Sequence, residues 1–186
     1  MAELVTVGHG TADAEELAEL LTAAGIGLVV DVRRFPGSRR DPSVARDALQ
    51  ARLPTAGIAY RWEERLGGRR RVPAGTEGEP DGWWRVEAFR AYAAYMRTDA
   101  FHAGLDALLA DTGGVRVAVM CSETLWWRCH RRLISDAATL LRGIAVRHLM
   151  HDGTETPHVP SEGARPVDGR LYYPPSRPRG SGDEIT

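Results

Sequence analysis

Two kinds of hydrophobic pattern alternate along this chain. Near-continuous apolar runs, typical of parallel strands covered on both faces, occupy residues 4–7, 26–32, 58–62, 115–120 and 144–149. Stretches with apolar residues at helical spacing separate or follow them, at residues 13–25, 43–53, 86–96, 101–110 and 126–141. This alternation predicts an α/β fold, a single three-layer domain with a mostly parallel, doubly wound sheet and right-handed crossovers.

Local signals indicate where the helices begin and end. Asp13 and Ser43 each precede a helical pattern, and their side chains are expected to cap it. Gly25 and Gly143 each follow a helical pattern and are expected to end it.

Two segments interrupt the regular pattern. Residues 33–42 contain two prolines and a glycine, and residues 66–82 are rich in glycine, proline and charge. Long irregular segments inside a domain are often functional. Gly67 and Gly68 permit backbone conformations closed to other residues. We therefore predict that both segments flank one pocket and that the second folds over it.

Length and composition limit the class of protein. The 186 residues fit an α/β domain over residues 1–150, followed by a Pro/Gly-rich C-terminal tail over 151–186 that we expect to be extended or partly disordered. No apolar run is long enough to span a bilayer, and the first residues do not resemble a secretory signal. Two cysteines cannot form a disulfide framework. These features predict a cytoplasmic protein without a membrane partner.

Charge is distributed unevenly along the chain. All basic residues other than histidine are arginines, and residues 33–71 contain eleven of them against four acids. That segment carries +7, while the rest of the chain carries −8. Arginine matches phosphate or carboxylate with two parallel hydrogen bonds. The segment is either an anion-binding region or a set of solvated loop arginines.

The ends of three predicted strands carry the residues best suited to chemistry. His9 follows the first strand, Asp31 and Arg33 close the second, and Cys121 and Glu123 follow the fourth. Parallel strands end at the same edge of a sheet, where α/β folds usually bind ligands. If these strands are neighbours, the five side chains converge. Asp31 then acts as a general base, or it caps a turn or pairs with Arg33.

The two cysteines allow several interpretations. Cys121 is placed to face a ligand, where a helix amino terminus and nearby arginines favour a thiolate. Cys129 lies on the apolar stripe of the following helix and is expected to pack in the core. A zinc site is not expected, because no CxxC pair exists and adjacent Cys129 and His130 would point in different directions on a helix. The segment from Cys121 to Arg128 contains no glycine and is a poor phosphate cradle.

Tryptophans occur close to the arginines and to this turn. Four of the five form the adjacent pairs Trp83-Trp84 and Trp126-Trp127. One member of each pair is expected in the core, because tryptophan buries a large area. The other would lie near arginine, and this combination can stack a base while holding its phosphate.

Several segments together resemble domain-of-unknown-function family 488. They are Val7-Gly8-His9, the strand ending in Asp31-Val32-Arg33 with Pro36 and Ser38-Arg39, Leu66-Gly-Gly-Arg69, and above all Cys121-x-Glu123 followed by Cys129-His130-Arg131. Their order and spacing agree from about residue 4 to residue 150. Gly10 stands where the family commonly has serine. The resemblance implies an intracellular α/β domain with a polar site on these segments, and it supplies no settled reaction.

The first hypothesis for function is an enzyme that acts by hydrolysis or group transfer on an anionic, nucleotide-like or nucleic-acid-derived ligand. We expect neither a cofactor nor a metal. Asp31 or Glu123 would supply acid/base catalysis, with His9 and Cys121 at the reacting centre. The ligand-binding residues would be Arg33, Ser38, Arg39, Gly67, Gly68, Arg69, Trp126, His130 and Arg131.

Two alternatives belong to other classes. The chain is either a non-catalytic module that binds nucleic acid or a nucleotide, with an affinity that falls steeply with salt, or a thiol-based enzyme with Cys121 as nucleophile or redox residue. Carboxylates at the sheet edge favour an enzyme, because a pure phosphate binder gains nothing from Asp31 and Glu123.

Overall fold

A six-stranded sheet forms the centre of the protein in the computed structural model, which describes residues 3–37, 41–72 and 80–176. The strand order is β3-β2-β4-β1-β5-β6, with the first five strands parallel and β6 antiparallel to β5. The strands are β1 (Glu3–Gly8), β2 (Leu28–Asp31), β3 (Ala59–Trp62), β4 (Val117–Cys121), β5 (Ala145–Leu149) and β6 (Glu155–Pro157). The five parallel strands lie where the apolar runs predict them.

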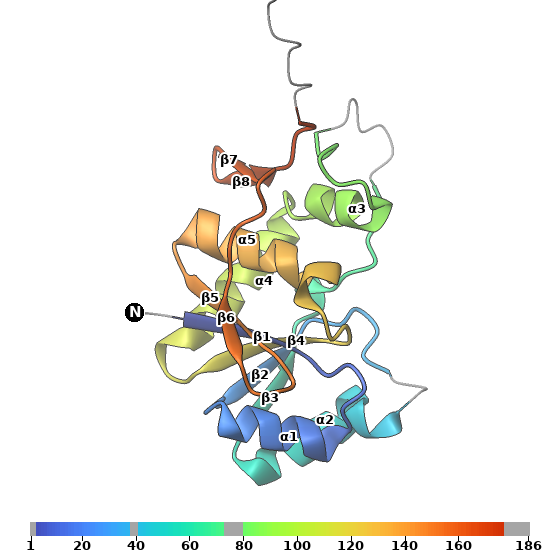
Figure 1. Ribbon diagram of the computed structural model, residues 1–186, viewed down its shortest axis with the longest axis vertical. Coiled ribbons are helices and arrows are strands. Elements are labelled where there is room, and N and C mark those ends of the chain that lie inside the picture. Colours follow the sequence, from blue (N-terminus) through green and yellow to red (C-terminus); the bar gives the residue numbers. More distant parts are fainter. Residues whose placement is uncertain (1–2, 38–40, 73–79, 177–186) are drawn as a thin grey trace, which may run out of the picture.

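Helices cover both faces of the sheet. α1 and α2 lie on one face, and α4 and α5 lie on the other, with α3 on that same side (Figure 1). Their bounds are α1 (Ala14–Ala23), α2 (Arg46–Arg52), α3 (Glu87–Tyr95), α4 (Asp99–Ala110) and α5 (Arg131–Arg142). Short 3-10 helices are η1 (Pro42–Val44), η2 (Leu53–Ala56), η3 (Glu64–Leu66), η4 (Asp111–Gly113) and η5 (Trp126–Arg128). The prediction of a three-layer α/β domain with a mostly parallel sheet is confirmed.

Each central strand contributes side chains to two separate cores. In β4, Val117, Val119 and Cys121 pack on the side of α4 and α5, whereas Ala118 and Met120 pack on the side of α1 and α2. This follows from the two-residue period of a strand, which sends successive side chains to opposite faces. A strand buried on both faces has no polar alternation, which is why it reads as a continuous apolar run.

Three of the four predicted helix ends are confirmed, including Gly25, which follows the end of α1 with φ 67°, and one is wrong. The Asp13 side chain caps α1 in a capping box, and Gly143 ends α5 in the left-handed conformation with φ 67°. Ser43 does not cap the second helix, because α2 begins at Arg46 without a side-chain cap. The Ser43 hydroxyl instead accepts a hydrogen bond from the backbone N–H of Ala14. It therefore serves the neighbouring helix α1.

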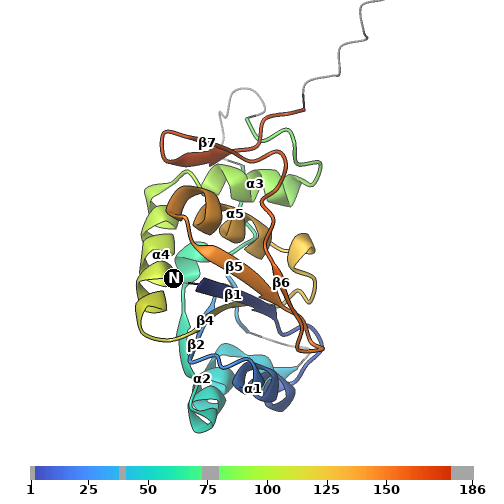
Figure 2. The same ribbon diagram turned by 60° about the vertical axis from the view of Figure 1, so that its left-hand side comes forward.

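Part of the Pro/Gly-rich segment after residue 150 folds onto the domain. β6 extends the sheet beside β5, and the strands β7 (Arg165–Val167) and β8 (Arg170–Tyr172) form a hairpin that Figure 2 shows next to α3. Leu171 and Tyr173 are buried in the core on the α5 side. The sequence did not predict these three strands, and the domain boundary at residue 150 stays a prediction. Among the described helices, none has the length and apolar character needed to cross a membrane.

Candidate functional site

The fold opens a crevice where neighbouring strands send their chains in opposite directions. β1 and β4 are adjacent, and the chain leaves β1 toward α1 on one face but leaves β4 toward α5 on the other. Such a switch point at the carboxyl ends of the strands is the usual ligand site of open α/β sheets. The three strands β2, β4 and β1 are neighbours in this order, which the sequence could not establish. His9, Arg33 and Cys121 therefore meet at one edge.

A pocket with a cavity volume of about 630 Å³ occupies this crevice. Residues from the loops after β1, β2 and β4 line it, together with Gly68 and Arg69 and with side chains of α3. The charged side chains in its lining are Arg33, Arg34, Arg69, Glu123 and Arg128. Volume and composition suit a small anionic molecule.

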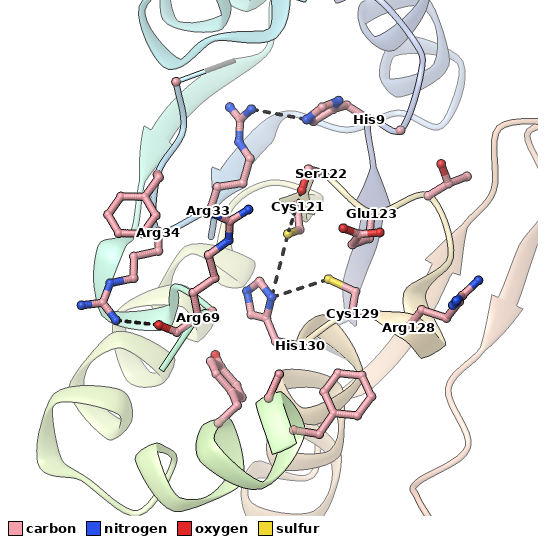
Figure 3. Close-up of a pocket in the computed structure, with 18 of the residues that line it drawn as sticks. His9, Arg33, Arg34, Arg69, Cys121, Ser122, Glu123, Arg128, Cys129 and His130 are labelled. Atoms are coloured by element: carbon pink, nitrogen blue, oxygen red, sulfur yellow. Dashed lines mark hydrogen bonds between the residues drawn. The ribbon is translucent and has the colours of Figure 1, made fainter. Parts of the chain in front are cut away.

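Two thiols and one imidazole gather on a wall of the pocket. The Nδ1 atom of His130 lies 3.6 Å from Sγ of Cys129 and 3.9 Å from Sγ of Cys121. Figure 3 shows the three side chains pointing toward one another. The Nε2 atom of His130 lies 3.1 Å from the backbone oxygen of Val32, an acceptor, so Nε2 carries the proton and Nδ1 presents a lone pair to the sulfurs. We call Cys121, Cys129 and His130 the Cys-Cys-His cluster.

The sequence argument that Cys129 and His130 would point in different directions on a helix is wrong. Both residues precede α5 instead of lying on it, and Cys129 has an extended backbone with φ −126° and ψ 151°. The extended residue turns its side chain back toward Cys121, beside His130. Cys129 is buried in the core, as the apolar stripe predicts, and it also lines the pocket.

The two thiols differ in acidity. Burial raises the pKa of Cys129, but the hydrogen bond from Cys121 and the charge of Arg131 outweigh burial and lower this pKa to about 6. The hydrogen bond with Cys129, together with burial, raises the pKa of Cys121. Of the two, Cys129 and not Cys121 is the more acidic thiol, which reverses the order expected from the sequence.

Arg131 lies behind the cluster and not in the pocket. Its side chain is buried, donates from Nε to Sγ of Cys129 at 3.4 Å, and donates from Nη2 to the backbone oxygen of Glu123. It is not part of the pocket lining. The structure therefore gives Arg131 a positioning role beneath Cys129 and Glu123, where the sequence predicted contact with the ligand.

Asp31 is likewise removed from the pocket. Its carboxylate is fully buried, accepts from Nε and Nη2 of Arg33 at 2.6 to 3.0 Å, and accepts from the Tyr60 hydroxyl at 2.6 Å. In the sheet register Asp31 pairs with Met120, so its side chain points to the α1 side while Cys121 points to the α5 side. The structure supports Asp31 as the partner of Arg33 and, through the hydrogen bond from the Arg33 backbone N–H, as the cap of the turn, two of the three roles left open by the sequence.

Arg33 and His9 form another wall. Arg33 Nη1 donates to the backbone oxygen of Val44 at 2.8 Å and lies 3.4 Å from Nε2 of His9 (Figure 3). Burial, followed by the charge of Arg33, lowers the pKa of His9 to about 4, so the ring is neutral near pH 7. Its Nδ1 atom is buried without a hydrogen-bond partner in the part of the chain that the structure describes.

The two irregular segments meet at the pocket. Arg34 Nη1 donates to the backbone oxygen of Arg69 at 3.0 Å, and both residues line the cavity. Arg69 has a positive φ of 54°, which is uncommon for a residue with a side chain. Closure over a ligand stays a prediction. Ser38 and Arg39 lie outside the described residues.

The two glycines act through size and not through unusual backbone angles. Gly67 has φ −63°, and Gly68 is not among the described glycines with positive φ. A Cβ atom on Gly68 would stand 2.9 Å from Nδ1 of His130, and one on Gly67 would stand 2.9 Å from the Cα atom of Arg34. Gly68 lines the pocket and Gly67 does not. Neither glycine has a positive φ in this conformation, and close packing against Arg34 and His130 explains both residues, while their role in closure stays a prediction.

The aromatic rings at the pocket are not the ones expected. Trp126 stacks on His148 at 3.8 Å with an angle of 6° between the rings, and it is not part of the pocket lining. Phe35, Phe89 and Tyr92 line the cavity instead, and Phe35 is 65% exposed. Phe35 is thus an exposed ring beside Arg34 at the pocket, in place of the tryptophan that the sequence predicted there.

Much of the positive charge in residues 33–71 is compensated within the protein. Ion pairs to carboxylates involve Arg33, Arg46, Arg52, Arg61 and Arg65. Arg70 lies over the ring of Tyr95, with 3.7 Å from its guanidinium carbon to the ring centre. Of the described arginines of the segment without an ion pair, Arg34 and Arg69 line the pocket, whereas Arg70 and Arg71 do not.

The sequence missed Arg34 and Arg128 as pocket residues. Both were visible in the sequence. Arg34 lies in the segment 33–42, directly after Arg33, and Arg128 ends the segment that begins at Cys121, directly before Cys129. Glu123, by contrast, lies where it was expected, exposed at the pocket. None of the described side chains forms an ion pair with its carboxylate.

An α/β domain with a polar pocket of this kind agrees with what the sequence motifs imply about family membership. The chain matches the family described as domain of unknown function DUF488 over residues 13–138. The protein therefore belongs to this family. The matched range includes Asp31, the Cys-Cys-His cluster and Glu123, and it begins after His9. Neither the curated proteins nor the solved structures yield a match.

Proposed function

We propose that this protein is an enzyme that acts by hydrolysis or group transfer on an anionic, nucleotide-like ligand. The observation that carries the proposal is the joint presence of arginine guanidinium groups, a Cys-Cys-His cluster and the Glu123 carboxylate on one pocket at the switch point of the sheet. Anion-binding groups alone would suit a binding module. A carboxylate beside them can transfer protons, and thiols beside them can act as nucleophiles.

The arginines divide into one fixed and three available groups. Arg33 is buried and held by Asp31, so it presents a preoriented positive wall. Arg34, Arg69 and Arg128 line the pocket without an ion pair to any described carboxylate. Guanidinium groups of this kind bind phosphate oxygens in pairs. We assign them to the charged part of the ligand.

We assign the remaining groups of the pocket to the other parts of the ligand and to proton transfer. Phe35 offers an exposed ring at the same pocket, which suits the flat face of a base. Glu123 is the carboxylate of the pocket lining and is our candidate for proton transfer. His9 and Cys121 line the same pocket, and we assign them to the reacting centre. Asp31 contributes through Arg33, as a positioning residue.

Binding of nucleoside phosphates and short oligonucleotides, measured by calorimetry at two salt concentrations, tests the anionic ligand. Arg69→Gln and Arg128→Gln should each weaken binding about tenfold, since a hydrogen bond to a charged group contributes about 1.5–3 kcal/mol. Arg52→Gln is the matched control, because Arg52 pairs with Glu15 and does not line the pocket. Equal losses in all three variants, or no binding by wild type, would contradict the proposal.

Turnover separates an enzyme from a binding module. Glu123→Gln should retain ligand affinity and lose turnover by about 100-fold or more, the usual contribution of a positioned acid or base. A ligand that binds with a steep salt dependence and is never converted would instead support the nucleic-acid-binding alternative.

A thiol-based enzyme is the second candidate, and the contact of Arg131 with Cys129 at 3.4 Å favours it. In that case the substrate would be trapped covalently on Cys129 during turnover. Intact-mass spectrometry of the quenched reaction distinguishes the two mechanisms, since the first leaves the mass of the protein unchanged.

A further inference from the structure

We propose that Cys121, Cys129 and His130 bind a thiophilic divalent cation, with Zn²⁺ the best-matched ion, and leave one coordination position open to the pocket. The three donor atoms, Sγ, Sγ and Nδ1, all lie within 4.8 Å of one another. Tetrahedral zinc holds sulfur at about 2.3 Å and nitrogen at about 2.0 Å, which places a sulfur and a nitrogen about 3.6 Å apart. The two measured separations, 3.6 and 3.9 Å, correspond to that spacing.

The imidazole is oriented as a metal ligand would need to be. Its Nε2–H is directed at the backbone oxygen of Val32, which leaves Nδ1 free of a proton and turned toward both sulfurs. Metal-bound histidines are almost always fixed in this way by a hydrogen bond from the other ring nitrogen. Gly68 keeps the space beside Nδ1 free, since a Cβ there would come within 2.9 Å of it.

The charges of the site also favour an ion. Two thiolates and a neutral imidazole around a divalent cation sum to zero, so the ion and its three ligands carry no net charge, and the buried Arg131 guanidinium adds one positive charge beside them. Arg131 Nε donates to Sγ of Cys129 at 3.4 Å and acts as an outer partner of that sulfur. Two sulfurs and one nitrogen select zinc or another soft ion over Mg²⁺ and Ca²⁺, which require oxygen ligands.

The pocket shows why this site would be catalytic and not structural. Structural zinc sites have four protein ligands, whereas catalytic sites have three and keep a position for water. All three residues of the Cys-Cys-His cluster line the same cavity as Glu123 and Arg128. No fourth histidine, cysteine or carboxylate joins the group among the described residues.

The use of the site rests on the proposed function, although binding of the ion does not. A bound water would give one proton to Glu123, and its oxygen would form a bond to the electrophilic atom of the anionic ligand. The bond to the leaving group would break with its electron pair, and the leaving group would take the proton from Glu123. Water is the only co-reactant, and zinc lowers its pKa to about 7 in such sites.

Cobalt titration of the full-length, reduced and chelator-treated protein tests the site directly. We expect one Co²⁺ per chain, with a thiolate-to-cobalt charge-transfer band and the visible bands of tetrahedral cobalt, both displaced by Zn²⁺. Cys121→Ser, Cys129→Ser and His130→Gln should each weaken binding by about 100-fold or more, because even changes to outer partners cost about 10–100-fold. His102→Gln on α4, remote from the pocket, is the matched control.

Alkylation of the wild-type protein keeps the test valid if a variant does not fold. Zn²⁺ should protect both cysteines from iodoacetamide, and a chelator should restore labelling. Failure of reduced wild type to bind Co²⁺, or unchanged affinity in Cys129→Ser, would overturn the proposal. Neither readout uses a substrate. Metal binding without any anionic ligand would contradict the proposed function alone, and ligand turnover by metal-free protein would contradict the catalytic use of the ion while leaving both ion binding and the proposed function standing.

Discussion

Two clusters of polar side chains, one that includes Asp136 of α5 and one directly before α5, differ in the lengths of their contacts and in their access to a cavity. In the closed cluster, Thr6, His148, His158, Asp136 and Tyr173 form one continuous chain of contacts of 2.7 to 3.0 Å, all buried. In the Cys-Cys-His cluster the contacts are 3.6 to 3.9 Å and face a pocket of about 630 Å³. A high density of histidine and polar residues therefore does not by itself indicate a site. Polar side-chain atoms that make only long contacts and border a cavity do indicate a site.

The largest expected effect comes from opening the closed cluster. Asp136 accepts from the Tyr173 hydroxyl and the Ser161 backbone N–H and contacts His158, and all of these groups are buried. Asp136→Ala should lower the free energy of unfolding by about 3–5 kcal/mol, since it leaves buried partners unsatisfied.

Urea denaturation measures this loss, and Cys129→Ser is the comparison from the open cluster. The serine variant should lose less than about 2 kcal/mol, because only weak sulfur contacts are removed. Similar losses in the two variants would mean that the clusters do not differ in the way proposed.

The second effect is a loss of stability in acid. Burial, followed by the charges of His158 and Arg131, lowers the pKa of His148 from 6.5 to about 3. Asp136 lies next to His158 in the same chain of contacts. The unfolded chain therefore binds a proton that the folded protein does not, between about pH 6.5 and pH 3. Stability is complete above pH 6.5 and falls on acidification, by about 1.4 kcal/mol per pH unit for this group.

Urea unfolding at several pH values between 7 and 4 checks the acid effect. His148→Gln lacks the titrating ring and should show a shallower dependence, although it is less stable at pH 7. The same slope in both proteins would assign the acid sensitivity to other groups.

A smaller effect is expected where a buried pair supports the wall of the pocket. Tyr60→Phe removes the hydroxyl that donates to Asp31 at 2.6 Å, while Arg33 remains paired with that carboxylate. The expected loss is about 1 kcal/mol, the net contribution of one hydrogen bond. Thermal unfolding measures it. A loss as large as that of Asp136→Ala would mean that the hydrogen bonds around Asp31 are as important for stability as those of the closed cluster.

The smallest effect on stability should come from the exposed residues of the pocket. Glu123→Gln and Arg128→Gln should change the free energy of unfolding by less than about 0.5 kcal/mol, since both side chains are exposed. The same denaturation experiments provide the values. Destabilisation of several kcal/mol by either variant would show that the pocket residues hold the fold together.

The parallel sheet could be predicted because its signals are local. Each strand buried on both faces is a continuous apolar run, and Asp13 and Gly143 act within one helical turn. Ser43 was predicted wrongly because the hydroxyl bonds to Ala14, 29 residues away in the chain. Strands β6 to β8 were missed because each has only three residues, too few for a period to be visible.

The site was predicted in part, for a related reason. The edge that brings His9, Arg33 and Cys121 together follows from parallel strands ending on one side. The face on which Asp31 points depends on register with β4, which the sequence does not contain. The position of Cys129 beside His130 depends on the extended backbone of Cys129 before α5. The apolar positions at helical spacing continue through Cys129, so the sequence pattern does not reveal that extended residue.

The strand β6 has a further consequence for the behaviour of the protein in concentrated solution. It covers the free edge of β5, which would otherwise present unpaired backbone groups to another molecule. β6 itself has three residues and ends at Pro157, which has no N–H to donate. A short, proline-terminated border is a poor template for a further strand. The segment after residue 150 thus protects this edge of the sheet from edge-to-edge pairing.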